Sequence, residues 1–383
     1  MVITVPASFD EVARELTLEA AQLAGLGTVT LLEEPLAAFY CWLDQHEEDW
    51  QAAVTPGELI LVCDVGGGTT DFTLISLRET DGSPRFERIA VGDHLILGGD
   101  NIDLHLARLA AQSRGRNLSH DQWKTLAHQS RGAKEELLGG EVAQKTLTLM
   151  GGGSRLIAGP ISMQLARETV EAAVRETFFP LVSADDPGAD LMDAGLADFG
   201  LPYEADPAVT RHLGTFLARQ RENVQAHLGK REPKPDLILF NGGSLKAGLV
   251  QDQIRRAVGH WFAGEGGELP RILPNPDLDL AVSRGAAYYG LVKSGLGVRV
   301  GSGSARAFYL GVDAARTDPD AGPAAVCLVE KGLEEGSAIS LSDLKLEVLA
   351  NQPMRVNLFS SSYRAGDRCG QLVAVDDSLT PLP

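Results

Sequence analysis

The order of apolar and polar positions predicts that strands and helices alternate through most of the chain. Two β-branched apolar runs, residues 59–63 and 72–77, are typical of buried strands, and the short glycine-rich segment between them predicts a hairpin. A third apolar run, residues 236–240, ends at another glycine pair and leads into a helical pattern that carries Ile254 and Val258. Elements in this order are typical of an α/β fold.

The N-terminal residues predict a smaller set of alternating elements. Residues 2–5 form an apolar strand, a helix follows as far as Leu23, and a second strand covers residues 29–32. Pro35 is suited to the first turn of the next helix, which runs to about Asp44. Because nothing precedes the first strand to pair with it, we expect the chain to begin inside a longer protein.

The middle of the chain is predicted to be mainly helical. The expected elements are a helix after Gly98-Gly99, a helix capped by Ser119, strands at 143–149 and 154–158, and an amphipathic helix carrying Leu165, Val170, Val174 and Phe178. Residues 183–208 are rich in aspartate and are expected to be a solvated insertion without chemistry.

The pattern changes near residue 297. Residues 298–304 have the composition of a flexible join. Short alternating runs then predict strands at 325–330, 344–349, 354–360 and 371–375. We therefore expect two parts, residues 1–297 and a small β-rich part over residues 298–383 whose core is unfinished at its C-terminal end.

Composition narrows the classes of partner. The formal net charge of −18 argues against nucleic acid and against anionic membrane surfaces. No apolar run approaches the roughly 20 residues that a membrane span needs, and no basic, apolar leader is present. The four cysteines are scattered without a paired motif, which is typical of reduced thiols and predicts a cytoplasmic location.

The hairpin between the first two apolar runs has the composition of a phosphate-binding turn. Three glycines, Gly66, Gly67 and Gly68, allow backbone amides to approach an anion closely. Asp64 and Asp71 flank the turn, and two carboxylates beside a phosphate are suited to a divalent cation or its bound water. A turn that only reverses the chain needs neither carboxylate, so phosphate binding is favoured. It is not a Walker loop, because no Gly-Lys-Ser/Thr follows.

Further motifs are spread over the N-terminal three quarters of the chain. They are Val2-Ile-Thr-Val-Pro-Ala7, Glu34-Pro35-Leu-Ala-Ala38, Asp64-Val-Gly-Gly-Gly-Thr-Thr-Asp71, Gly92-Asp93 with Leu97-Gly98-Gly99, Ala133-Lys134, Gly242-Gly243-Ser244, and Asn275-Pro276-Asp277 with Gly285-Ala-Ala287. In this order they resemble the nucleotide-binding domain of DnaK-type heat-shock chaperones. The resemblance covers residues 2–295. It implies an actin-like ATPase fold (ribonuclease-H-like) without its N-terminal hairpins, followed by a partial β-sandwich.

The same resemblance implies ATP or ADP with Mg²⁺ as ligands, and it assigns roles to residues. Glu34 and Asp71 would place the attacking water, Asp64 would hold Mg²⁺ through water, and Thr69 would complete the catalytic set. The implied nucleotide-binding residues are Gly66, Gly67, Gly68, Gly98, Gly99, Lys134, Gly242, Gly243, Ser244, Lys246 and Asp279.

Some positions depart from the family pattern. The first phosphate loop and its lysine are absent, because the chain begins after them. Glu135 and Lys246 replace two arginines beside the adenine, so stacking on the base is expected to be weaker, and Arg131 replaces a glutamate. The acidic position near residue 277 can be counted in two ways, and helix geometry favours Asp279, which we expect to cap the following helix and face the cleft.

The implied function is that of a DnaK-like chaperone which hydrolyses ATP to control its binding of client peptides, with co-chaperones as further partners. This chain alone is expected to hydrolyse little ATP. Two alternatives stay open: a sugar or acid kinase of the actin-like fold, in which a substrate hydroxyl replaces water, and a non-catalytic interaction module that has lost tight nucleotide binding.

Overall fold

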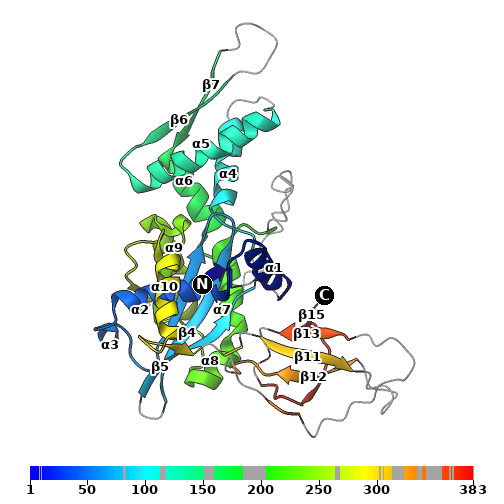
Figure 1. Cartoon of the computed structure of the whole chain (residues 1–383). Coiled ribbons are helices and arrows are strands. Elements are labelled where there is room, and N and C mark those ends of the chain that lie inside the picture. The colour runs from blue at the N-terminus through cyan, green and yellow to red at the C-terminus, as the bar shows by residue number, and fades with distance from the viewer. Residues whose placement is uncertain are drawn as a thin grey trace, which may run out of the picture.

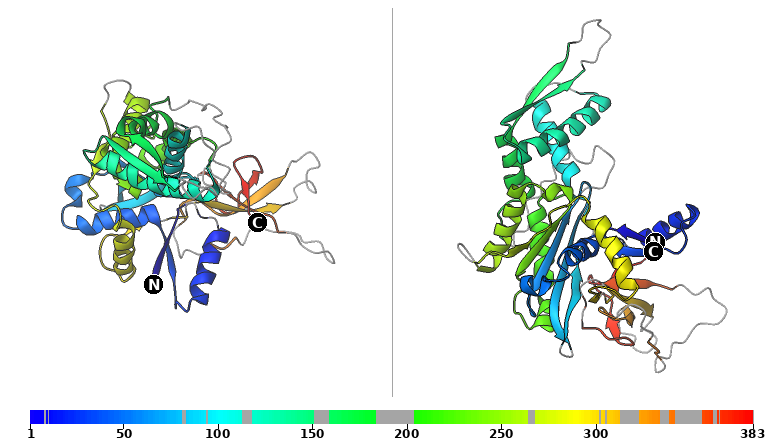
Figure 2. Two further views of the ribbon diagram at one scale, coloured as in Figure 1. Left: turned by 90° about the horizontal axis from the view of Figure 1, so that it is seen from above. Right: turned by 60° about the vertical axis from the view of Figure 1, so that its left-hand side comes forward.

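The computed structural model is a mixed α/β structure with a β-rich unit near its C-terminal end (Figure 1). It describes residues 1–382 except 8, 10, 81–82, 94, 113–117, 151–158, 184–203, 264–267, 302, 305, 313–322, 334–338, 342–355, 362–363 and 365. Figure 2 shows that the hairpin formed by β6 (Gln144–Leu149) and β7 (Ile161–Ala166) projects from the end of the molecule opposite the β-rich unit.

A six-stranded mixed sheet forms the centre of the molecule. Its strands are β3 (Leu59–Val65), β4 (Thr70–Thr80), β5 (Ser83–Val91), β8 (Leu237–Asn241), β9 (Arg271–Leu273) and β10 (Val300–Gly301), in the order β10-β5-β4-β3-β8-β9. Strands β3, β4 and β5 are antiparallel, whereas β8 and β9 continue the sheet in parallel with β3. The predicted hairpin and the predicted strand at residues 236–240 are confirmed, and the structure shows that they are neighbours in this sheet.

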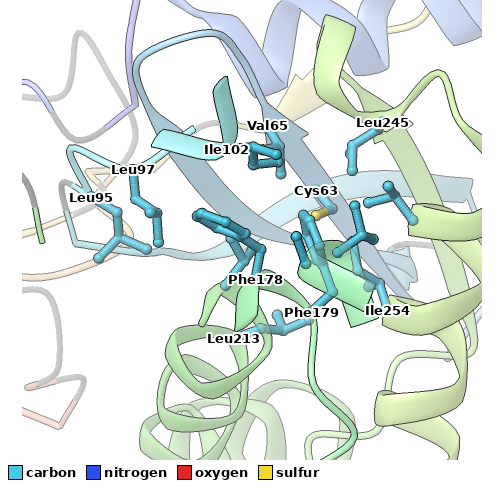
Figure 3. Packing of buried hydrophobic residues seen from close by; sticks show 14 of the residues in the cluster. Cys63, Val65, Leu95, Leu97, Ile102, Phe178, Phe179, Leu213, Leu245 and Ile254 are labelled. Carbon is cyan, nitrogen blue, oxygen red and sulfur yellow. The ribbon is translucent and has the colours of Figure 1, made fainter. Parts of the chain in front are cut away.

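Alternate residues of β3 contribute to two separate hydrophobic clusters. Leu61 and Cys63 belong to a large cluster that includes residues of α4, α5, α7 and α9, and Figure 3 shows Phe178 and Phe179 packed in it. Ile60 and Val62 belong to a second cluster with α2 and α10. Because successive side chains of a strand point to opposite faces, both faces of the sheet are covered by helices.

Helices α2 (Glu34–Gln45) and α10 (Ala281–Lys293) pack closely against each other. At Gly285 of α10, an added Cβ would lie 1.7 Å from the carbonyl oxygen of Ala37 in α2. Gly285 therefore allows the backbone of α2 to approach α10 closely. The short helix α3 (Trp50–Ala53) follows α2 and places Trp50 in the same cluster.

The N-terminal residues form a two-stranded parallel sheet. Strand β1 (Val2–Val5) pairs with β2 (Thr30–Glu33), and helix α1 (Glu11–Leu23) connects them. Buried Glu33 forms ion pairs with Arg14 of α1 and Arg88 of β5, and Arg88 also donates to the carbonyl of Gly303 at 3.0 Å. This ionic cluster connects the small sheet to the central sheet and to the residues that enter the β-rich unit.

The remaining helices surround the first cluster or form the projecting end. They are α4 (Gly99–Gln112), α5 (His120–Gly139), α6 (Arg167–Ala172), the π-helix η1 (Ala173–Phe178), α7 (Val209–Arg219), α8 (Arg221–Leu228), the 3₁₀ turn η3 (Gly243–Leu245) and α9 (Gly248–Ala263). The cap predicted at Ser119 is confirmed, because its side chain accepts from the amide of Gln122 and the Gln122 side chain accepts in return. No helix in the described residues is long and apolar enough to cross a membrane.

The region of the predicted long amphipathic helix differs from the prediction. Strand β6 (Gln144–Leu149) pairs with β7 (Ile161–Ala166), so Leu165 lies in a strand, and α6 begins only at Arg167. Residues of β7 alternate between exposed and buried positions. Because the helix follows this strand directly, the short two-residue period was interpreted as the start of the helical pattern. The predicted strand at 154–158 lies outside the described residues, as does most of the acidic segment 183–208.

The β-rich unit is a five-stranded antiparallel sheet. Its strands are β11 (Ala307–Val312), β12 (Ala324–Val329), β13 (Leu358–Ser361), β14 (Leu372–Ala374) and β15 (Thr380–Pro381), in the order β14-β12-β11-β13-β15. The sequence prediction omitted β11 and β15, and its strand at 344–349 lies outside the described residues. The predicted flexible join is partly wrong, because Val300 and Gly301 form strand β10 and pair with β5.

Candidate functional site

The turn between β3 and β4 presents unpaired backbone amides at its tip. The turn is closed by the amide of Gly66, which donates to the carbonyl of Thr69 at 2.9 Å. Within the described part of the chain, the amides of Gly67, Gly68 and Thr69 donate to no protein acceptor. Gly68 is exposed, so these three donors lie where an anion from solvent can reach them.

Three glycine turns from distant parts of the chain meet at one carbonyl oxygen. The carbonyl of Gly66 accepts from the amide of Gly99 at 3.0 Å and from the hydroxyl of Ser244 at 2.8 Å. The amide of Asp100 donates to the neighbouring carbonyl of Gly67 at 2.7 Å. The predicted glycine motifs at residues 66–68, 98–99 and 242–244 therefore form one hydrogen-bonded site.

Two of these glycines have no room for a side chain. A Cβ added at Gly98 would lie 2.6 Å from the carbonyl oxygen of Gly67. Gly242 has φ +90°, and a Cβ there would lie 2.3 Å from the carbonyl oxygen of Val65 and 2.7 Å from a carboxylate oxygen of Asp64. The close approach of the turns thus depends on glycine at both positions.

Three carboxyl groups gather beside the turn between β3 and β4. Asp64 and Asp71 lie opposite each other on β3 and β4, and Glu34 begins helix α2. Burial raises the pKa of Asp64 to about 7; its hydrogen bond from Asn241 lowers that pKa, and the charges of Glu34 and Asp71 raise it further. Burial and then the charge of Asp71 also raise the pKa of Glu34. The charges of their neighbours thus disfavour ionisation of Asp64 and Glu34, and a bound cation would relieve that repulsion.

Asn241 is a site residue that the sequence analysis missed. It ends β8 in parallel register with Asp64, and its side-chain amide donates to the Asp64 carboxylate at 2.8 Å. Its buried Oδ1 atom accepts no hydrogen bond from the described residues. The available signal was its position at the carboxyl end of a parallel strand, immediately before a glycine pair.

The oxygen atoms of this site fit a hydrated magnesium ion. Mg²⁺ prefers oxygen ligands and keeps several waters, and Asp64, Asp71, Glu34 and the free Oδ1 of Asn241 supply oxygen acceptors around one place. Across the described residues, no three His, Cys, Asp or Glu side chains are close enough to bind one ion directly. The arrangement therefore suits contact through water better than a cage of direct ligands.

Two basic residues of α5 lie beside the glycine turns. Lys134 is buried, donates to the carbonyl of Gly99 at 3.1 Å and pairs with Asp103 at 2.7 Å. Arg131 is about half exposed and pairs with Asp100 at 3.1 Å, and a Cβ added at Gly67 would lie 3.2 Å from its Nη2 atom. Arg131 thus places positive charge next to the turn between β3 and β4, at a position where the resemblance implies a glutamate.

The predicted capping role of Asp279 is wrong. The carboxylate of Asp277 accepts from the amides of Asp279 and Leu280, both at 3.2 Å, immediately before α10. Asp279 instead forms an exposed ion pair with Lys246 at 2.6 Å. The earlier aspartate bonds the loop amides instead, because an Asp side chain readily accepts from amides two and three residues ahead.

Comparison with known proteins agrees with the order of the motifs. A family model described as "Hsp70 protein" matches residues 1–179. A chaperone protein HscA homolog of Pseudomonas fluorescens (strain SBW25) is 32% identical over 273 residues, which cover 70% of this chain and 38% of that protein. A chaperone protein HscA homolog of Azotobacter vinelandii is 32% identical over 251 residues, which cover 64% of this chain and 36% of that protein. The chain thus spans less than two fifths of the length of the curated relatives it matches, and it belongs to the Hsp70 family.

Proposed function

We propose that residues 1–297 bind ATP and ADP together with Mg²⁺ at the three glycine turns, as an actin-like ATPase domain. The observation that carries this proposal is the junction at Gly66, whose carbonyl accepts from both Gly99 and Ser244 while the three following amides have no protein acceptor. Such a cluster of amides binds phosphate oxygens. Three adjacent carboxyl groups are then suited to a cation and to water rather than to the phosphates themselves.

Each group of residues has a distinct task in this proposal. The amides of Gly67, Gly68 and Thr69 hold the terminal phosphate, and the turn at Gly242–Ser244 lies on the nucleoside side. Asp64, supported by Asn241, would hold water bound to a magnesium ion, and the charge of that ion would offset the charge of the phosphates. Glu34 and Asp71 orient the water that attacks the phosphorus. Phosphoryl transfer needs charge neutralisation and an oriented nucleophile, and these residues supply both.

The β-rich unit supports the proposal of a chaperone role. We propose that its five-stranded antiparallel sheet corresponds to the first strands of a β-sandwich that binds unfolded client peptides, and that nucleotide state and co-chaperones control this binding. Strand β10 and the hydrogen bond from Arg88 to Gly303 join the unit to the central sheet.

Lys134 and Lys246 would contact the ribose and the adenine, with Asp279 holding Lys246 in place.

Calorimetric titration of the purified chain with MgATP, MgADP and a hexose tests this proposal. We expect both nucleotides to bind and the hexose not to bind. Gly98→Ala should abolish nucleotide binding, because its Cβ would lie 2.6 Å from the carbonyl oxygen of Gly67, whereas Gly132→Ala has no atom within 4 Å of the added Cβ and should bind normally. Absence of binding by the unmodified chain would refute the proposal, and hexose-dependent ATP turnover would favour a sugar kinase.

A further inference from the structure

The β-rich unit brings together two cysteines that are far apart in the sequence. Cys327 lies in β12 and is fully buried, and Cys369 lies in the turn before β14 and is partly exposed. The backbone of Cys327 bonds to that turn twice, since its carbonyl accepts from Gly370 at 2.7 Å and its amide donates to Gln371 at 2.9 Å. The segments that carry the two thiols are therefore held side by side by the backbone.

The turn itself directs the Cys369 side chain toward β12. The amide of Gln371 donates to the carbonyl of Arg368 at 2.9 Å, and Gly370 has φ +85°, as the third residue of a type II turn requires. Cys369 is the second residue of this turn. Its thiol donates to the carbonyl of Leu328 at 3.4 Å and lies within hydrogen-bonding reach of the Cys327 thiol. Two thiols within this reach, on segments that the backbone holds side by side, are candidates for a disulfide.

We propose that Cys327 and Cys369 form a redox-active pair, which a peroxide converts into an intramolecular disulfide. The Cys369 thiolate attacks one peroxide oxygen, the O–O bond breaks, and one water leaves after protonation, so that Cys369 becomes a sulfenic acid. The Cys327 sulfur then attacks the sulfur of Cys369 and displaces the hydroxyl as a second water. Two thiols are oxidised and one hydrogen peroxide is reduced to two waters.

Exposure decides the order of the two steps. Cys369 is the residue that solvent reaches, whereas Cys327 has no exposed surface. Burial, together with the neighbouring Cys369, Asp367 and Glu330, raises the pKa of Cys327 to about 12, so Cys327 is a poor first nucleophile and is suited to the resolving role. The other two cysteines are buried in other elements. Cys63 lies in β3, and Cys41 lies in α2, where the Cys41 sulfur accepts a hydrogen bond from the Gln45 side chain.

Formation of the disulfide would fasten β12 to the turn that precedes β14. The two residues enclose a long loop that contains β13, and crosslinks across long loops restrict the unfolded chain most. We therefore expect oxidation to raise the melting temperature of the β-rich unit by at least about 4 °C. The nucleotide site is not involved, so this inference is independent of the proposed ATPase function.

Peptide mapping after treatment of the folded chain with hydrogen peroxide tests the proposal. Free thiols are alkylated after the treatment, and we expect a Cys327–Cys369 linked peptide that disappears on reduction with dithiothreitol. Cys369→Ser should abolish the link, and Cys41→Ser should leave it intact. Cys327→Ser could disturb the core, so this variant is tested by a readout that needs only the first step. We expect dimedone to trap a sulfenic acid at Cys369, because the resolving thiol is missing.

Three outcomes would overturn the proposal. The first is that both thiols remain free after the treatment. The second is that Cys369 is oxidised to sulfinic or sulfonic acid in the unmodified chain without a link to Cys327. The third is a link that joins two chains or involves Cys41 or Cys63.

Discussion

Replacement of Gly242 by alanine should destabilise the chain and disrupt the site at once. The residue has φ +90° and ψ 144°, a conformation open almost only to glycine, and forcing alanine into it costs about 1–3 kcal/mol. The added Cβ would also lie 2.3 Å from the carbonyl oxygen of Val65. Val65 and Asn241 are fixed in paired strands on either side, so the overlap cannot be relieved cheaply, and overpacking of this kind adds about 1–3 kcal/mol.

The expected loss in the free energy of unfolding is therefore about 2–6 kcal/mol, a large part of a typical domain's stability. Gly243→Ala is the matched control, because its added Cβ meets no atom within 4 Å and its backbone is not in the left-handed region. Urea denaturation followed by circular dichroism measures both variants, and calorimetry measures their affinity for MgADP. If Gly242→Ala loses no more than about 1 kcal/mol beyond Gly243→Ala and binds nucleotide normally, the strain and the overlap argued here are wrong.

Three further changes test other parts of the structure. The pKa of Asp64 is raised to about 7, so without ligand this carboxyl stabilises the folded state progressively as the pH falls from 7 toward the ordinary pKa of an aspartate. Asp64→Asn should weaken that pH dependence of the melting temperature. Gly285→Ala should lower the melting temperature by several degrees, because the Cβ would overlap the backbone of α2, whereas Gly290→Ala in the same helix should not. Arg131→Gln should weaken MgATP binding about tenfold, as measured by calorimetry, because it removes the positive charge beside Gly67 that would attract the phosphates. Arg131→Lys retains that charge and should keep most of the affinity.

Most of the central fold could be predicted from the sequence, because its strands are buried on both faces and are continuous apolar runs. Strands β3, β4 and β8 fall within a few residues of the predicted ranges. The weak points were short or mixed elements. Strand β7 stands directly before a helix, and β10 has only two residues, whose pairing with β5 no local pattern signals.

The candidate site was predictable only where glycine marked it. The three turns could be found because close approach of their backbones requires glycine, which is visible in the sequence. The structure brings these three turns together at the Gly66 carbonyl. Asn241 was missed because asparagine before a glycine pair is common in ordinary turns. The contact between Cys327 and Cys369 could not be foreseen at all, since it depends on the register of two strands and on a turn that only the three-dimensional structure defines.

The carbonyl of Gly66 has a mechanical consequence. One of its two donors, Gly99, begins α4, which belongs to the projecting end of the molecule, and the other, Ser244, stands just before α9 beside the central sheet (Figure 1). The oxygen therefore holds the start of α4 and the turn before α9 at one point. If the projecting end rotates relative to the sheet, one of two changes must follow. Either the hydrogen bond from the Gly99 amide to the Gly66 carbonyl breaks, or the peptide groups of the turn between β3 and β4 reorient together with α4. A ligand held by the next three amides would resist that rotation, so its presence should be measurable as slower hydrogen exchange at the start of α4.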